Sequence, residues 1–201
     1  MNREVSPFVR PLRGTGFMMN IVPIIDSAMA FEDAVAGTKA PREVIDALCL
    51  VNVRHWAFDG QLHQGQLIIH RGIAKDIVEI FELIEQTKFP VTRIIPIVKY
   101  KWSDDISMAD NNTSAFNYRV VIGTERLSHH AYGRAVDINP CLNPVIYDNG
   151  RIDPSGATYN PAMPGTLYAS HALVKEFIAR GWRWGGNFRS SVDYHHFDKP
   201  A

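Results

Sequence analysis

The pattern that most constrains the fold of this chain is a strand, a tight turn, a second strand and a helix. Residues 48–58 are rich in apolar side chains that alternate, Asp59-Gly60 follows, and residues 66–70 form a second apolar run. An Asp-Gly pair between two such runs is a strong signal for a β-hairpin. Residues 72–86 then carry one apolar stripe with helical spacing. The stripe consists of Ile73, Ile77, Ile80, Phe81 and Ile84.

Shorter elements are expected around this unit. Apolar spacing and end signals predict helices at 28–36, 41–48, 103–110 and 171–180. Strands are expected at 91–100, where Pro96 indicates an edge or a bulge, and at 136–138. The residues that mark helix ends by capping or by breaking the backbone pattern are Ser27, Gly37, Pro41, Ser103, Ser170 and Gly181.

These elements predict an α+β fold, with a small antiparallel sheet flanked by helices. Residues 1–47 are interpreted as an N-terminal arm with short helices, irregular over residues 1–25, and residues 48–201 as the main domain. No linker separates the two parts, so one compact domain is expected. Residues 145–169 hold several Pro and Gly residues and little periodicity, which predicts a long loop. This loop is either a wall of a cleft or ordered surface.

Composition excludes several classes of protein. The chain has 201 residues, of which 46% are apolar and 21% charged, as in a globular domain. Lys plus Arg equals Asp plus Glu at 21 each, so the chain lacks the basic field typical of nucleic-acid binding. No apolar run reaches the roughly 18 residues of a transmembrane helix, and we identify no signal peptide. Cys49 and Cys141 allow either one disulfide or two reduced thiols.

A stretch with the pattern SxHxxGxAxD, residues 128–137, favours a metal site. His130 and Asp137 lie seven residues apart, and the sequence at 136–138 alternates like a strand. Gly133 permits a tight bend between them. Imidazole and carboxylate are ordinary zinc ligands, and a catalytic zinc typically takes about three protein ligands. Ser128 is expected to cap or brace the loop that carries His130.

A second stretch near the C-terminus complements the first. It reads Trp184-Gly185-Gly186 and then Asp193-Tyr194-His195-His196-Phe197. His196 is the expected third ligand, and Asp193 the expected base that would move a proton during hydrolysis. In an extended segment, His195 would point to the other side. Arg119 is a candidate to stabilise a developing oxyanion, although a surface ion pair is an alternative for this residue.

Together these stretches resemble the zinc D-alanyl-D-alanine carboxypeptidase family, which includes L-alanyl-D-glutamate endopeptidases. The resemblance rests on SxHxxGxAxD at 128–137, WGG at 184–186, DxxHF at 193–197 and the segment 112–119, and it extends loosely over 48–200. It implies a Hedgehog/DD-peptidase-like fold and a Zn²⁺ cofactor. The implied ligands are His130, Asp137 and His196, with Asp193 as acid/base and Arg119 as the residue that polarises the carbonyl. Many members have Glu at the position of Asp193.

The resemblance further implies a peptidase that cuts an amide bond in peptidoglycan stem peptides, in the cell envelope or outside the cell. Ser128, Tyr132, Tyr147 and Trp184 are predicted substrate contacts, with Tyr159 as a further candidate. Two alternatives stay open. One is a non-catalytic wall-binding or signalling module that retains zinc, and the other is a hydrolase that uses a Ser128–His130 pair. His63 and His70 are interpreted as polar edge positions rather than ligands.

Overall fold

The structure, a computed structural model, describes residues 21–189 and 191–200, so most of the predicted irregular arm lies outside the described residues. The helices are α1 (Phe31–Ala34), α2 (Arg42–Asp46), α3 (Ala74–Thr87), α4 (Asp104–Ala109) and α5 (Ala172–Ala179). The strands are β1 (Ile24–Ile25), β2 (Leu48–Trp56), β3 (Leu62–His70), β4 (Arg93–Ile94), β5 (Asn112–Thr113), β6 (Ala135–Asp137), β7 (Val145–Tyr147), β8 (Ile152–Asp153), β9 (Arg183–Trp184), β10 (Ser191–Asp193) and β11 (His196–Asp198).

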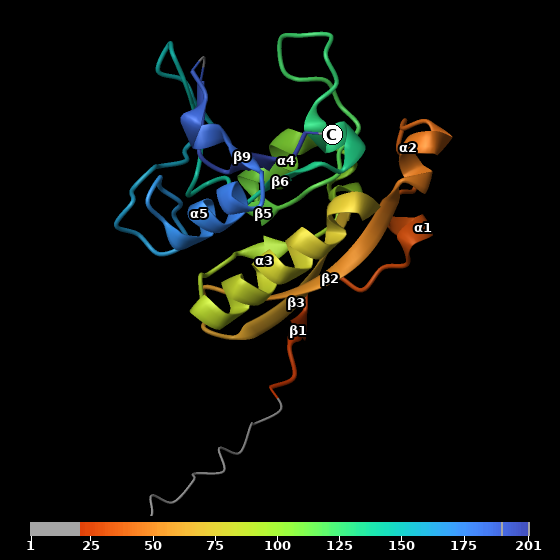
Figure 1. Cartoon of the computed structure of the whole chain (residues 1–201), viewed down its shortest axis with the longest axis horizontal. Coiled ribbons are helices and arrows are strands. Elements are labelled where there is room, and N and C mark those ends of the chain that lie inside the picture. Colours follow the sequence, from red (N-terminus) through yellow and green to blue (C-terminus); the bar gives the residue numbers. More distant parts are fainter. Residues whose placement is uncertain (1–20, 190, 201) are drawn as a thin grey trace, which may run out of the picture.

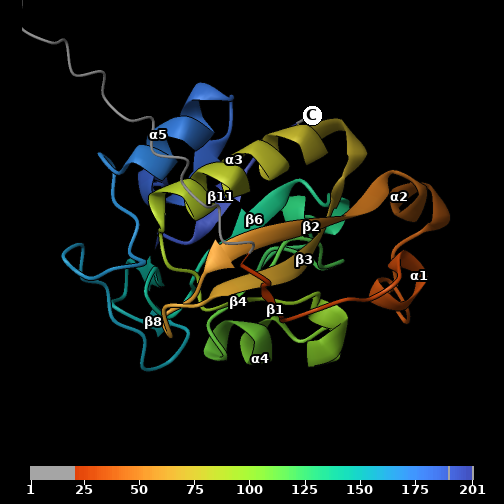
Figure 2. The ribbon, with the colours of Figure 1, turned by 90° about the horizontal axis from the view of Figure 1, so that it is seen from below.

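The predicted hairpin and helix are confirmed and form the largest unit of the molecule. β2 and β3 pair antiparallel from Leu48 opposite His70 to Trp56 opposite Leu62. The second strand begins four residues earlier than expected. Helix α3 lies along one face of this hairpin (Figure 2), and the apolar stripe of α3 is buried there. Each fully buried Ile or Phe contributes about 1.5–3 kcal/mol relative to an exposed position. The buried helix residues are Ile77, Ile80, Phe81 and Ile84.

The mixed α+β class is confirmed, but the expectation of one antiparallel sheet is wrong. The strands of the described residues form three three-stranded sheets and one two-stranded sheet. Two pairings are parallel, β1 with β3 and β4 with β5. Most strands outside the hairpin have only two or three residues, so they cannot extend into one continuous sheet. The likeness to the Hedgehog/DD-peptidase fold stays a prediction.

The predicted strand at 91–100 is mostly wrong. Only β4 is extended, and a 3₁₀-helix occupies Ile97–Tyr100 after Pro96. Proline has no N–H to donate to a strand ladder. The backbone N–H of Ile95 donates instead to the side-chain oxygen of Asn112. Hydrogen bonding by a buried asparagine therefore replaces strand pairing at this point.

Two predicted helix caps are also wrong. The hydroxyl of Ser27 donates to the side-chain oxygen of Gln66 at 2.7 Å, and α1 starts only at Phe31. At α5, the imidazole of His171 rather than Ser170 accepts the N–H of Leu173. Ser103 does cap α4, accepting from the N–H of Ile106. The predicted long loop contains the short antiparallel pair β7–β8.

Residues 21–47 pack on the same body as the hairpin. β1 pairs with β3, and Ala34 of α1 is buried with Leu48, Ile68 and Phe116. The two cysteines are both free, so the alternative of reduced thiols holds. Within the described part of the chain, no helix has the length and apolar character needed to cross a membrane.

Gly133 fixes the SxHxxGxAxD stretch, residues 128–137, onto the hairpin. Its φ of +62° is in the left-handed region, and a Cβ there would lie 2.5 Å from Leu48 Cδ2 and 2.9 Å from His70 N. The carbonyl of Gly133 accepts the N–H of His70 at 2.8 Å. This close approach joins the end of the hairpin to the segment between His130 and Asp137.

Gly133→Ala is expected to lower the free energy of unfolding far more than Gly60→Ala. Gly60 has a similar φ of +76° but nothing within 4 Å of an added Cβ. The control therefore measures the left-handed penalty alone, about 1–2 kcal/mol. Denaturant unfolding of the two variants checks this. Equal losses would show that the close packing at Gly133 contributes nothing.

Candidate metal centre

The pairing of β6 with β11 builds the candidate site. In this antiparallel pair, His196 lies opposite Asp137, and β9 pairs with the other edge of β11. A 3₁₀-helix at His129–Tyr132 leads into β6 and presents His130. These C-terminal strands lie at the opposite side of the molecule from β1 (Figure 1). This pairing brings together Asp137 and His196, which are 59 residues apart in sequence.

The three predicted ligands converge. One potential ligand atom from each of His130, Asp137 and His196 lies within 4.8 Å of the others. His130 Nε2 is 3.1 Å from Asp137 Oδ2, and His196 Nδ1 is 3.0 Å from Asp137 Oδ1. The two ring nitrogens are 3.2 Å apart. His130 and Asp137 are each only 2% exposed, so this cluster is largely shielded from solvent.

Hydrogen bonds on the outer nitrogens orient both rings. Nδ1 of His130 faces the carbonyl of Ala115, which can only accept, so this nitrogen carries the hydrogen. Nε2 of His196 lies 3.1 Å from Asp198 Oδ2 and donates to it. In the neutral rings, both inner nitrogens then present lone pairs to each other and to the Asp137 carboxylate. Such an arrangement fits a cation at its centre, as in metal sites with carboxylate-bound histidines.

Burial and the neighbouring charged groups together set the pKa values of Asp137 and His196. Burial alone would raise the pKa of Asp137, but His130 and His195 nearby hold it well below its usual range. Burial would lower the pKa of His196, but hydrogen bonds to Asp137 and Asp198 outweigh this and raise it to about 10. Without a metal ion, the site therefore holds an anionic carboxylate and a proton on His196.

Asp198 is a functional candidate that the sequence reasoning missed. It is 2% exposed, and it accepts from Arg183 Nε at 2.6 Å as well as from His196. Residues two apart on a strand share one face, so the position of Asp198 after His196 could have indicated this contact.

Asp193 and His195 both face the cluster. Asp193 Oδ1 lies 3.1 Å from His195 Nε2, which is 3.9 Å from Asp137 Oδ2. His195 Nδ1 donates to the carbonyl of Asn143. The expectation that His195 points away is therefore wrong. The chain bends between β10 and β11 at Tyr194-His195, so strand alternation does not apply there.

A cavity of about 370 Å³ opens beside the cluster. Arg119 lines it and is held by Asp104, whose Oδ2 is 2.8 Å from Arg119 Nη2. The cavity thus combines the ligand cluster, the candidate base and three arginines. Its lining residues are Arg119, Val121, Arg126, Ser128, His129, His130, Arg183, Phe188, Ser191, Asp193, His196 and Asp198.

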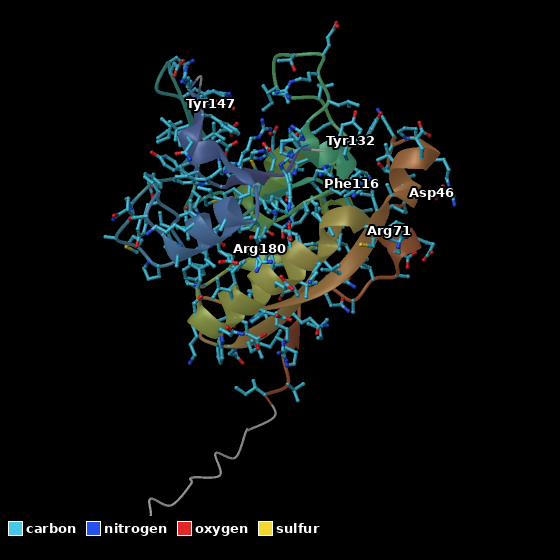
Figure 3. All side chains as sticks on the ribbon, viewed as in Figure 1. Asp46, Arg71, Phe116, Tyr132, Tyr147 and Arg180 are labelled. Carbon is cyan, nitrogen blue, oxygen red and sulfur yellow. The ribbon has the colours of Figure 1, made fainter. Side chains whose placement is uncertain are left out.

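The predicted substrate contacts lie in different places. Ser128 lines the cavity, and its Oγ accepts the backbone N–H of His130. Tyr132 lines a neighbouring groove instead, next to His129 and Arg126. Tyr147 packs under the guanidinium of Arg151. Figure 3 shows Tyr132 and Tyr147 well apart.

Trp184 and Tyr159 have structural partners. Trp184 is 3% exposed in the hydrophobic core, and its indole N–H donates to the carbonyl of Tyr194. Tyr159 stacks on Tyr194 with ring centroids 3.6 Å apart. Neither residue lines the cavity. Both support the 193–196 bend from behind.

Gly185 lies directly against the bend that carries Asp193 and His196. A Cβ on Gly185 would be 2.4 Å from the carbonyl oxygen of Asp193 and 3.2 Å from the Cβ of His196. At Gly186 a Cβ would overlap the indole of Trp184. The WGG stretch therefore lets the backbone pack tightly behind the cluster.

Asp198→Asn is expected to weaken metal binding by about 10- to 100-fold, because outer carboxylates orient the ligand ring and raise its basicity. The matched control is Asp148→Asn, which changes the same group at an exposed position. Equilibrium dialysis with Zn²⁺ measures both affinities. Unchanged affinity in Asp198→Asn would remove Asp198 from the site.

Metal affinity is expected to rise with pH across the neutral range, by up to about tenfold per pH unit. The reason is that the raised pKa of His196 keeps this ring protonated below about pH 10, so a metal ion must displace a proton. The measurement is calorimetric titration of Zn²⁺ in buffers with different ionisation enthalpies. An affinity that is flat with pH, with no proton released, contradicts this assignment.

Comparison with known proteins gives one family. Residues 122–199 match the sequence model described as D-alanyl-D-alanine carboxypeptidase. This segment contains all three converging side chains, Asp193 and Asp198. No curated protein matches the chain, and no solved structure matches it.

Proposed function

We propose that this chain is a zinc-dependent peptidase acting on peptidoglycan stem peptides, because residues 122–199 match the family model described as D-alanyl-D-alanine carboxypeptidase. The observation that carries the proposal is the convergence of two imidazoles and one carboxylate beside a cavity that also contains Asp193 and Arg119. The substrate lies in the cell envelope, so we propose action there or outside the cell.

His130 Nε2, Asp137 and His196 Nδ1 would hold the metal ion. Their donor types suit Zn²⁺, and the rings are already oriented by Ala115 and Asp198. When bound, a zinc ion polarises a carbonyl oxygen and lowers the pKa of a water molecule towards about 7. A group of three ligands among the described residues favours a catalytic site over a closed structural one with four.

Asp193 accepts the proton of the attacking water and passes it to the departing amine. Its carboxylate lines the cavity and is partly exposed, so it can reach both groups. His195 Nε2 lies 3.1 Å from Oδ1 of this carboxylate. The backbone contact with Gly185 fixes the Cα position from which Asp193 reaches the substrate.

Arg119 stabilises the negative oxygen that forms when the amide carbon is attacked. Asp104 of α4 holds its guanidinium at the cavity wall, through a contact of 2.8 Å. Asp104 also accepts from Asn117, which fixes the carboxylate in turn. Donors fixed before the reaction need no reorganisation when charge develops, and one such donor typically contributes about 10²- to 10³-fold in rate.

The arginines of the cavity favour a substrate that carries carboxylates. Arg183 already pairs with Asp198, and Arg119 with Asp104. Arg126 forms no ion pair within the described part of the chain and lines both the cavity and the neighbouring groove. Stem peptides carry free carboxylates at D-amino acids, and we propose Arg126 as the residue that binds one of them.

The alternative that Ser128 and His130 form a hydrolytic pair has little support. Ser128 Oγ accepts from the backbone of His130, and both ring nitrogens of His130 have other partners. The imidazole is therefore not placed to take a proton from the hydroxyl. A non-catalytic module with retained zinc predicts the same ligands but no hydrolysis.

Asp193→Asn is expected to retain stoichiometric zinc and to lose at least about 100-fold in hydrolysis, because only the proton carrier is removed. The assay is mass spectrometry of purified muropeptides after incubation with the protein, with and without a chelator. Loss of a terminal D-alanine and release of an L-alanine-linked fragment have different masses, so the same assay identifies the bond that is cut.

The matched control is Glu125→Gln, which neutralises an exposed carboxylate on the loop beside the cavity. Its hydrolysis should equal that of the wild type. Full activity of zinc-loaded Asp193→Asn would exclude Asp193 as the base. No cleavage by the zinc-loaded wild type would favour the non-catalytic module.

A further inference from the structure

A second cluster of one carboxylate and two imidazoles lies at the other end of the hairpin. Asp26, His55 and His63 each offer one ligand atom within 4.8 Å of the others. His55 of β2 is directly opposite His63 of β3, and Asp26 follows β1. This pair is seven residues, or about 23 Å at 3.3 Å per residue, from the Leu48–His70 end of the hairpin, against which Gly133 packs. Figure 1 shows β1 on the far side of the molecule from β6 and β9.

His55 is the most unusual member of the cluster. Its side chain is fully buried, and neither ring nitrogen has a hydrogen-bond partner among residues 21–189 and 191–200. Its Nε2 faces Asp26 Oδ2 at 3.5 Å, and this oxygen also lacks a hydrogen-bond partner in that part of the chain. Each buried polar group left without a partner costs about 1–3 kcal/mol. The unpartnered Nε2 of His55 and Oδ2 of Asp26 thus face each other within this cluster.

His63 repeats the arrangement of the first centre. Its Nδ1 lies 2.7 Å from Asp26 Oδ1, and its Nε2 lies 3.1 Å from Asp59 Oδ2. Asp59 is itself held by the backbone N–H of Gln61 at 2.9 Å. An outer carboxylate on one nitrogen and an inward-facing second nitrogen is the geometry seen for His196 with Asp198. Such outer carboxylates are typical of metal-binding histidines.

We propose that Asp26, His55 and His63 form a second binding site for a divalent transition-metal ion of the zinc type. Two imidazoles with one carboxylate suit zinc, whereas calcium and magnesium prefer oxygen ligands throughout. The ligands come from three segments, so a bound ion cross-links the N-terminal segment to the hairpin.

The contacts that attach the N-terminal segment to the hairpin are few. β1 pairs with β3 over two residues only, and Ile24 and Ile25 are 41% and 51% exposed. This short strand buries little apolar surface. Beyond Asp26, the contacts of Ser27 and Met29 with the side chain of Gln66 continue the attachment. An ion bound by Asp26, His55 and His63 would therefore hold β1 and the following residues in place.

The test counts Zn²⁺ ions per full-length chain by mass spectrometry of the metal after dialysis against dilute Zn²⁺. The wild type should hold two ions. Asp26→Asn, and separately His63→Gln, should hold one. The matched control Asp33→Asn, which changes an exposed carboxylate of α1, should keep two. The double variant His130→Ala/His196→Ala should keep one ion.

In that double variant, Zn²⁺ should raise the melting temperature, and adding Asp26→Asn should abolish the rise. If the wild type holds one ion and the Asp26→Asn variant also holds one, the proposal is overturned. If the wild type holds one ion and the Asp26→Asn variant holds none, the second site is supported, and the result counts against zinc at the first site. If Asp26→Asn fails to fold, one retained ion in the His130→Ala/His196→Ala variant supports the proposal, and none overturns it.

Discussion

The candidate metal centre depends on one strand register. Antiparallel pairing of β6 with β11 sets His196 opposite Asp137, and a shift by one residue would turn His196 to the other face of the strand. Phe197 prevents this shift. It is fully buried and stacks on Phe177 with ring centroids 3.9 Å apart. Apolar packing on one face of β11 therefore holds His196 on the other face.

Charge around the centre is arranged so that few groups are left uncompensated. Asp137 is almost fully buried, and burying an unpaired carboxylate is costly. Two imidazoles face its oxygens, and its backbone exchanges hydrogen bonds with Ser114. Asp198 continues the chain of contacts outward to Arg183, whose side chain is half exposed. A cation in the cluster, whether a proton or a metal ion, completes this balance.

Buried asparagines hold the backbone behind the centre. Asn139 has a φ of +48° and bonds the backbone of Thr92, Pro90 and Gly165 through its side chain. Asn143 accepts the N–H of Leu167 at 2.6 Å. These residues follow β6 directly, where the Asn-Pro pairs predict turns. The turns occur, but the sequence pattern does not reveal that their side chains replace strand pairing.

The sequence predicts those parts of the fold and of the site that depend on interactions within one short segment. The hairpin, α3 and the His130–Asp137 spacing all depend on alternation, helical spacing or a glycine at a bend, so they could be read from one stretch each. The orientation of His195 could not, because a bend between two short strands overrides alternation. The position of Trp184 could not be predicted either, because a tryptophan next to a motif is compatible with a cleft wall and with a hydrophobic core.

The second cluster was hidden for a related reason. Asp26, His55 and His63 come from separate segments with no motif spacing, and His63 alone reads as a polar edge residue. Only the register that sets His55 opposite His63, together with the parallel pairing of β1, brings them together. Motifs reveal sites whose ligands share a loop, whereas sites assembled across a sheet require the pairing to be known.

The two clusters are connected by packing. The N-terminal segment, residues 21–47, contains Asp26 and buries Ala34 against Phe116, and the neighbouring carbonyl of Ala115 orients His130. Phe116 also contacts Trp102 edge-on, at 5.8 Å between ring centroids. The 114–117 backbone is also held by hydrogen bonds of Ser114 with Asp137 and of Asn117 with His130. Packing of residues 21–47 on Phe116 therefore adds to the contacts that position the Ala115 carbonyl beside His130.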